Sequence, residues 1–340
     1  MPSRRKVLNH GRGAIQLSLD KAHYISGDVI TGSVCVNVTE LIKCNGTSIK
    51  RIPKAIALRL LWHVEIAIYF TGREQVAWKE DPSDGKNEVR YCTNKRVIVA
   101  QKLVLKNTLT KLCRGEHTYS FQYQLPYGLP STFDNHGDAD ILAKIEYFIK
   151  GAVRIKGGTN QCLQNEQALL VYSNFGGSVA RCKAEKECAV RLLYAIPQGK
   201  CTLRAAANKP FYCPGDVAQI QVDIQNPSRQ RIRSLECRLC RQLVVAAGQI
   251  RQVKRTIYSM ELPGVAAGAT TTQLLSFQFA RTAFQPSTEG SYIRVTYTID
   301  IVANFAWAIS KCAFQLQSAH DGPMVHPLSI ESAAVRRRMA

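Results

Sequence analysis

The stretch HYISGDVITGSV, residues 23–34, indicates the fold because its plan returns in the second half of the chain as FYCPGDVAQIQV, residues 211–222. Each copy has a tyrosine, two spacer residues, Gly-Asp-Val and then alternating apolar side chains. Glycine adopts positive φ easily and aspartate hydrogen-bonds to nearby backbone, so the pair favours a tight turn. We expect two similar domains whose first strands meet at turns formed by Gly27, Asp28, Gly215 and Asp216.

A second pair of segments supports an internal duplication. SFQYQLPYGLPSTFDNHGDADILAKIEYFI, residues 120–149, is echoed by SFQFARTAFQPSTEGSYIRVTYTI, residues 276–299. Both contain Ser-Phe-Gln-aromatic, then Pro-Ser-Thr, then a strand-like run with a tyrosine. The first half is longer between the two landmarks, and we assign its extra residues to a long loop within the polar stretch 71–95.

The dominant hydrophobic period along the chain is two, which is typical of half-buried antiparallel strands. Short strands separated by Gly, Pro, Asn and Asp turns predict an all-β protein with two tandem immunoglobulin-like β-sandwich domains, residues 1–172 and 173–320, followed by a short tail, 321–340. Residues 169–174 are predicted to form a closing strand, and residues 179–196 are rich enough in Ala, Lys, Glu and Leu to predict a helix. Strand-like runs occupy residues 15–19, 34–38, 56–60, 119–123, 220–224, 235–239 and 295–299.

Composition predicts a soluble intracellular protein. The 340 residues include 46% hydrophobic and 21% charged side chains, without an apolar run of membrane-spanning length or a secretory leader. The 12 scattered cysteines predict reduced, mostly buried thiols. A formal net charge of +20 favours anionic partners, namely nucleic acids, lipid head groups or acidic and phosphorylated proteins.

No motif in the sequence predicts catalysis, a metal site or a cofactor. The seven histidines lack metal-ligand spacing, and the one tight cysteine pair, Cys237 and Cys240, places its side chains on opposite faces of a strand. A nucleophile elbow and a phosphate-binding loop are also absent from the sequence. We therefore expect a protein that is not an enzyme.

Three segments resemble the arrestin family, in particular the alpha-arrestins (arrestin domain-containing proteins). Residues 24–38, YISGDVITGSVCVNV, resemble that family's opening strand pair. Residues 125–153 resemble its Leu-Pro segment and the following strand, which contains Tyr-Phe/Trp-Lys in that family. Residues 199–242 are similar to the start of its C-terminal domain, including Tyr212, Pro214, Gly215, Asn226 and Ser228. The resemblance implies arrestin-type sandwiches in both halves.

The resemblance implies a cytosolic adaptor that binds tails of membrane-protein cargo and connects them to endocytic, endosomal-sorting or ubiquitylation machinery. Its location would be cytoplasmic and peripheral to endosomes or the plasma membrane. Alpha-arrestins usually recruit ubiquitin ligases through Pro-Pro-x-Tyr, whereas the one Pro-Tyr here is Pro126-Tyr127 inside a domain. Direct recruitment of a ligase is therefore not predicted from that motif, and the acidic loop of beta-arrestins is also missing.

Two basic clusters are candidate binding sites. In phosphate-sensing arrestins, the first strand and the following turn present Lys and Arg to phosphorylated tails, and the matching stretch here predicts an anion or cargo site. A second run predicts a surface that faces anionic lipid. The alternative for both clusters is an ordinary solvated basic surface. The first cluster contains Arg4, Arg5, Lys6, Arg12 and Lys21, and the second contains Arg229, Arg231 and Arg233.

Other function classes remain as alternatives. A retromer-type coat subunit shares the double sandwich but works as a permanent member of a complex. A basic nucleic-acid-binding protein would explain the charge, yet the sequence has no such motif and its aromatics lie at core-periodic positions, so we expect no nucleic acid partner. A hydrolytic or carbohydrate-binding sandwich would need paired carboxylates, which no repeated loop contains.

Overall fold

The computed structural model describes 13 segments: residues 6–8, 13–39, 63–80, 90–108, 112–136, 140–156, 163–174, 183–192, 196–209, 211–212, 215–279, 285–305 and 309–318. The chain divides into two compact units, Met1–Ser173 and Asn174–Ala340. The described segments of both units contain strands, turns and bends, and no helix occurs among them. The predicted all-β class is confirmed, while the predicted tail 321–340 lies outside the described residues.

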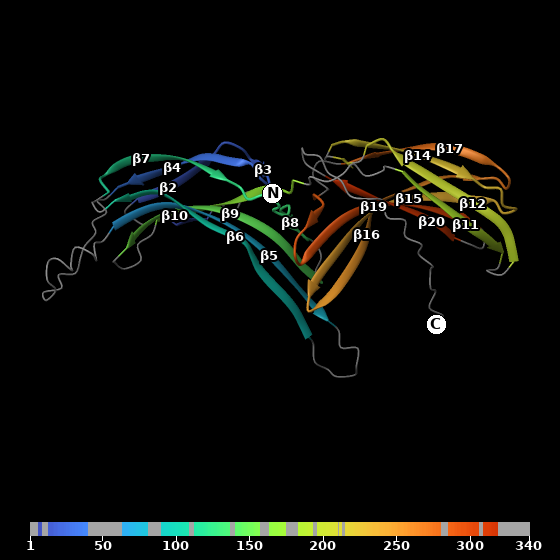
Figure 1. Ribbon diagram of the computed structural model, residues 1–340, viewed down its shortest axis with the longest axis horizontal. Coiled ribbons are helices and arrows are strands. Elements are labelled where there is room, and N and C mark those ends of the chain that lie inside the picture. Colours follow the sequence, from blue (N-terminus) through green and yellow to red (C-terminus); the bar gives the residue numbers. More distant parts are fainter. Residues whose placement is uncertain are drawn as a thin grey trace. The chain divides into compact units, whose positions relative to one another are not determined.

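The first unit is a two-layer sandwich (Figure 1). In its larger sheet, the strand order is β1 (Lys6–Leu8), β10 (Leu163–Tyr172), β9 (Ile141–Lys156), β5 (His63–Glu80) and β6 (Arg90–Thr108). Two short strands add to this sheet: β3 (His23–Ile25) runs parallel to β10, and β8 (Phe133–Asp134) pairs with β9. The smaller sheet consists of β2 (Gly13–Leu19), β4 (Val29–Val38) and β7 (Gly115–Gln124).

The larger sheet of the second unit repeats that of the first, except that the described residues include no counterpart of β1. Its order is β13 (Phe211–Tyr212), β20 (Ile309–Ser318), β19 (Ile293–Phe305), β15 (Ile232–Ala247) and β16 (Gln249–Val265), with β18 (Thr288–Glu289) beside β19. The short β13 runs parallel to β20, as β3 does to β10. The opposing sheet contains β11 (Lys183–Leu192), β12 (Ile196–Ala207), β14 (Val217–Gln225) and β17 (Thr270–Gln278). The internal repeat in the sequence is therefore a repeat of topology.

Alternation of side chains builds each core. Along β9, every second residue from Ile141 to Ile149 is buried, and the residues between them point to the other face. Full burial of one large apolar side chain stabilises the fold by about 1.5–3 kcal/mol. The fully buried tyrosines still satisfy their hydroxyls: Tyr147 donates to the Pro130 carbonyl at 2.8 Å, and Tyr297 donates to that of Gln285 at 2.9 Å. Burial raises the pKa of both, that of Tyr297 to about 12.

The two Gly-Asp pairs lie at equivalent turns. Gly27 and Gly215 have φ of +93° and +101°, conformations that favour glycine. Asp28 Oδ2 accepts a hydrogen bond of 3.1 Å from the Ile25 amide in the first turn. Asp216 Oδ2 lies 3.4 Å from the Lys209 ammonium in the second. Each turn leads directly into the strand that pairs across the smaller sheet, β4 or β14.

Two expectations from the sequence are wrong. Lys183–Leu192, inside the predicted helix 179–196, forms strand β11. Its helix-forming composition is overridden because Ala184 and Val190 are buried while the residues between them pair with β12. The predicted loop 71–95 is largely strand, since residues 71–80 belong to β5 and 90–95 to β6, so the extra residues lengthen a hairpin.

No helix of the length and apolarity that a membrane span requires occurs in the described part of the chain.

Candidate functional site

The outward face of the larger sheet in the first unit carries a concentration of cations. Strand register places Tyr69 of β5 between Lys150 of β9 and Lys102 of β6, and side chains directly opposite one another share a face. The alternate residues of β5 and β9 are buried, so this face is the one that points away from the core. We call it the basic face, defined by Arg73, Lys79, Lys95, Lys102, Lys144, Lys150 and Arg154.

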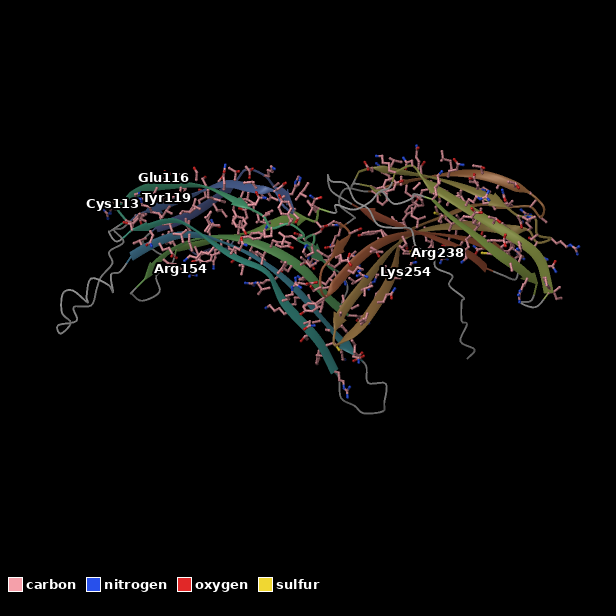
Figure 2. The ribbon with its side chains drawn as sticks, in the orientation of Figure 1. Cys113, Glu116, Tyr119, Arg154, Arg238 and Lys254 are labelled. Carbon is pink, nitrogen blue, oxygen red and sulfur yellow. The ribbon has the colours of Figure 1, made fainter. Side chains whose placement is uncertain are left out.

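Tyr69 lies at the centre of three of these cations. The Arg154 guanidinium is 4.6 Å from the ring centroid, the Lys150 ammonium 5.4 Å and the Lys102 ammonium 5.8 Å. A cation over an aromatic ring is attracted by about 0.5–1 kcal/mol at an exposed site. Figure 2 shows Arg154 on the layer that contains β9, apart from Glu116 and Tyr119 on the other layer. The uncharged ring thus holds three cations close together and leaves their positive charge in place.

Glu65 neutralises only part of this charge. Its buried carboxylate lies 2.7 Å from the Lys102 ammonium. The hydrogen bond from Lys102 to Glu65 raises the pKa of the lysine, which therefore stays cationic. Other carboxylates on this face are Glu146 of β9, Glu166 of β10 and Asp134 of β8, whose Oδ2 lies 3.0 Å from the Lys144 ammonium. Together with Glu65 they are fewer than the seven cations that define the face. The face consequently keeps a net positive charge.

Exposed apolar side chains lie on the same face along β6. Register with β5 puts Tyr91, Val97 and Val104 beside the cations, and Tyr91 is 73% exposed and Val97 60%. A face with cations and exposed apolar groups can bind a partner through both charge and burial.

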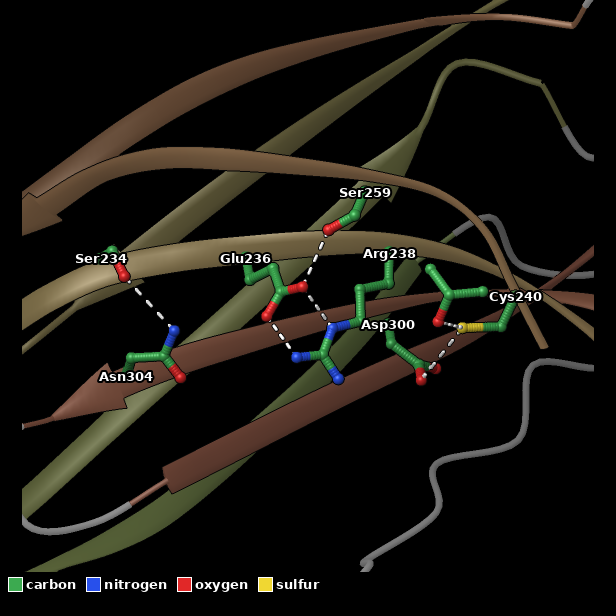
Figure 3. Close-up of polar contacts among 8 residues, drawn as sticks. Ser234, Glu236, Arg238, Cys240, Ser259, Asp300 and Asn304 are labelled. Atoms are coloured by element: carbon green, nitrogen blue, oxygen red, sulfur yellow. Dashed lines mark hydrogen bonds and ion pairs between the residues drawn. The ribbon is translucent and has the colours of Figure 1, made fainter. Parts of the chain in front are cut away.

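The corresponding face of the second unit has a different charge pattern (Figure 3). Arg238 donates from Nε to Glu236 Oε1 at 2.6 Å, and the Ser259 hydroxyl donates to the same oxygen at 2.8 Å. These contacts lower the pKa of Glu236, the one with Arg238 most strongly. Lys254 lies 2.8 Å from the buried Asp300 carboxylate. Arg238 and Lys254 each lie against a carboxylate, so the charge pattern of this face differs from that of the basic face.

The first basic cluster expected from the sequence is only partly described. Arg4, Arg5 and Arg12 lie outside the described residues, and Lys6 belongs to β1 with its side chain likewise outside them. The Lys21 ammonium is 3.7 Å from Asp28 Oδ2 and 6.0 Å from the Tyr24 ring centroid. Lys21 therefore belongs to the Gly-Asp turn, and its role in binding stays a prediction.

The second basic cluster lies on an ordered loop and the start of β15. Arg229, Arg231 and Arg233 are exposed. The Arg229 amide donates to the Gln198 carbonyl at 2.9 Å. Buried Asn226 fixes the preceding turn, because its side-chain amide donates to the carbonyls of Gln230 and Ala266 at 2.9 and 3.0 Å. The structure thus presents these arginines to solvent on a fixed backbone, and lipid binding stays a prediction.

The sequence reasoning missed the Tyr69 cluster. One signal was present, since residues 141–156 place Lys144, Lys150 and Arg154 on the polar side of an alternating strand. The order of strands, which brings β9, β5 and β6 side by side, was not readable from that alternation. Recognising this site therefore required knowledge of which strands lie next to β9.

Family models match both units. The model described as Arrestin (or S-antigen), N-terminal domain, matches residues 14–175, and the model described as Arrestin (or S-antigen), C-terminal domain, matches residues 197–318. The two matches together cover most of the chain, and each falls on one sandwich.

Curated relatives agree with this assignment. Arrestin domain-containing protein A of Dictyostelium discoideum is 22% identical over 313 residues, 89% of this chain and 50% of that protein. Arrestin domain-containing protein 5 of Bos taurus is 24% identical over 237 residues, covering 65% and 61%. Thioredoxin-interacting protein of Mus musculus is 22% identical over 246 residues, covering 70% and 55%. The chain spans about half to three fifths of the length of these relatives. It belongs to the arrestin superfamily and is alpha-arrestin-like.

Proposed function

We propose that this protein is a non-enzymatic cytosolic adaptor whose basic face binds acidic segments of membrane-protein cargo and links them to endocytic or endosomal sorting. Membership of an arrestin-type adaptor family supports the general role. The observation that carries the proposal is the cluster of Lys102, Lys150 and Arg154 around Tyr69. A carboxylate or phosphate would meet several charge-assisted donors there.

The mixed character of the face favours a peptide over a nucleic acid. The exposed apolar side chains of Tyr91, Val97 and Val104 lie beside the cations and suit aliphatic or aromatic residues of a peptide. Single-stranded nucleic acid is usually bound by successive aromatic platforms, whereas Tyr69 is covered by cations. We therefore do not propose a nucleic acid partner.

Association with an anionic membrane is a second part of the proposal. It is supported by the exposure of Arg229, Arg231 and Arg233 on one loop and strand start. Each such residue near an anionic surface contributes about 1 kcal/mol. The protein would then be cytoplasmic and peripherally bound to endosomes or the plasma membrane. Ubiquitylation machinery would be reached through a partner protein.

The test of the basic face is a binding titration with a defined probe. A fluorescent peptide that alternates Glu and Leu is titrated with the full chain, the K150Q/R154Q variant and the control K200Q/R204Q. The control removes exposed cations of the second unit, which pair with Glu187 and Glu185. We expect K150Q/R154Q to weaken binding about tenfold or more, which corresponds to about 1.4 kcal/mol. Equal affinity of both variants would contradict the proposal.

The assembly state of the protein in its own cells distinguishes an adaptor from a coat subunit. Affinity purification of the full chain from its own cells, followed by sizing and quantitative mass spectrometry, is expected to give a small particle with substoichiometric membrane proteins. A large assembly of fixed stoichiometry would support the retromer-type alternative instead.

A further inference from the structure

Two cysteines face each other across neighbouring strands of the second unit. Antiparallel pairing of β11 with β12 places Cys188 directly opposite Cys201, between the pairs Glu187–Thr202 and Ala189–Lys200. Opposite residues in such a ladder have Cα atoms about 4.5–5.5 Å apart and side chains on one face. Disulfides join residues with Cα separations of about 4.4–6.8 Å. The backbone therefore already holds these two residues at bridging distance.

The two thiols differ in access. Cys201 is completely buried, whereas Cys188 is partly exposed on β11, the end strand of its sheet. Burial raises the pKa of Cys201 to about 11, and the neighbouring Cys188 adds to that rise. Cys188 is consequently the thiol that a small reagent reaches first, and Cys201 is the one placed to resolve the product.

The other cysteines described on paired strands lie opposite residues that are not cysteines. Cys35 lies opposite Gln16 and Thr118, and Cys92 lies opposite Trp78. Cys237 lies opposite Met260 and Ile301, and Cys240 opposite Thr256 and Thr298. Within the strands whose register the structure gives, Cys188 and Cys201 are the one pair of cysteines directly opposite each other.

We propose that Cys188 and Cys201 form a reversible disulfide when the protein meets a small-molecule disulfide such as oxidised glutathione. The Cys188 thiolate attacks one sulfur of that disulfide, which forms a mixed disulfide and releases one small thiolate. The Cys201 sulfur, after losing its proton to solvent, attacks Sγ of Cys188 and releases the second. The protein loses two electrons and two protons, and the small disulfide is reduced to two thiols.

The Cys188–Cys201 disulfide would link the end strand β11 covalently to β12. β11 is the first described strand after the boundary between Ser173 and Asn174. End strands open locally more easily than central ones because they pair on one side. The bond closes the short segment between residues 188 and 201, so reduction would restore local opening of β11. Oxidation would thus limit the local opening of β11, the first described strand of the second sandwich.

Peptide mapping after redox equilibration tests the proposal on the full chain. The reduced protein is equilibrated with oxidised and reduced glutathione at a series of ratios, alkylated, and digested without reduction. We expect one linked peptide pair containing Cys188 and Cys201, a mass decrease of about 2 Da relative to the two thiol peptides, and its disappearance after dithiothreitol. Hydrogen exchange of β11 should slow in the oxidised form.

Matched variants assign the bond. C188S should abolish the linked peptide, and C35S, which removes a cysteine with no cysteine opposite it, should leave its yield unchanged. C188S changes a partly exposed residue and keeps buried Cys201 intact, so the fold is expected to persist and is checked by its melting curve. The proposal is overturned if both cysteines are alkylated at the most oxidising ratio. Stable glutathione on Cys188 with Cys201 still alkylated would overturn it as well.

Discussion

The hydroxyl of buried Tyr24 donates a hydrogen bond of 2.6 Å to Oδ1 of Asp20. The second unit has the same bond at the same length between Tyr212 and Asn208 Oδ1. The side-chain oxygen also accepts a backbone amide in each case, from Thr31 at 3.3 Å or from Gln219 at 3.0 Å. One geometry is therefore built with an ionisable acceptor in the first sandwich and a neutral acceptor in the second.

This difference predicts that the tyrosine hydrogen bond adds a pH dependence to the stability of the first unit and none to that of the second. The hydrogen bond from Tyr24 lowers the pKa of Asp20, so ionised Asp20 favours the folded state. Its contribution is complete above the ordinary aspartate pKa of about 3.9 and is lost as pH falls through the lowered pKa. D20N keeps the acceptor and should flatten this dependence, and N208D should add the equivalent dependence at the matching position of the second unit. Urea unfolding between about pH 6 and about pH 3 measures both, and parallel curves for wild type and D20N would contradict the prediction.

Gly72 of β5 is predicted to be intolerant of a methyl group. An added Cβ would lie 2.6 Å from the ring of buried Tyr147 and 2.9 Å from Val99. We expect G72A to lower the free energy of unfolding by about 1–3 kcal/mol, because the core would be overpacked. The control is G151A on β9, whose added Cβ would lie 3.2 Å from the terminal methyl of Ile15. Denaturant curves that show equal losses for both variants would refute the steric explanation.

Asn226 is predicted to tolerate no loss of its amide. Its side chain donates to two carbonyls and accepts 2.6 Å from the Ser228 hydroxyl, all in a buried turn. N226D preserves the shape but places a carboxylate against the carbonyls of Gln230 and Ala266. We expect a destabilisation of about 2–4 kcal/mol, since buried acceptors would lose their donors. Thermal unfolding of N226D beside Q219E, a change at an exposed residue, measures the effect, and equal melting temperatures would count against it.

Lys102 and Lys150 should contribute unequally to stability although both flank Tyr69. Removing Lys102 leaves the buried Glu65 carboxylate without its ammonium partner at 2.7 Å, so K102A should cost about 1–3 kcal/mol. K150A should stay within about 0.5 kcal/mol of wild type. Adding E65Q to K102A should recover part of the loss. A double-mutant cycle by urea unfolding gives the coupling, and a coupling of zero would show that the pair has no stabilising role.

The sequence predicted the architecture well because its turn chemistry and alternation are local. The Gly-Asp pair and the Pro-Ser-Thr landmark depend on residues close together in the chain, and both indicated the duplicated sandwich before strand order was known. The helix predicted for residues 179–196 was wrong because the decisive interactions are not local. The composition of these residues favours a helix in isolation, but pairing of β11 with β12 supplies hydrogen bonds and burial that outweigh this preference.

The candidate site was much less predictable than the fold. Tyr69, Lys102 and Arg154 come from three strands, and their proximity depends on the register of β5 with β6 and with β9. The sequence alone instead favours basic residues that are consecutive, such as Arg4, Arg5 and Lys6. The register between distant strands cannot be read from any single strand. A cluster of charges contributed by several strands is therefore not predictable from the sequence in this way.

The two sandwiches share their turns and strand order yet differ in the charge of one face. The side chains that specify the turns, such as Tyr24 and Tyr212, are separate from those that set the charge, such as Arg154 and Glu236. Substitutions of exposed residues on the strand faces, such as Lys150, can therefore change binding partners with little loss of stability. This separation makes the chain suitable for engineering. The binding specificity of one sandwich could be changed while the other, left unchanged, serves as an internal control for folding.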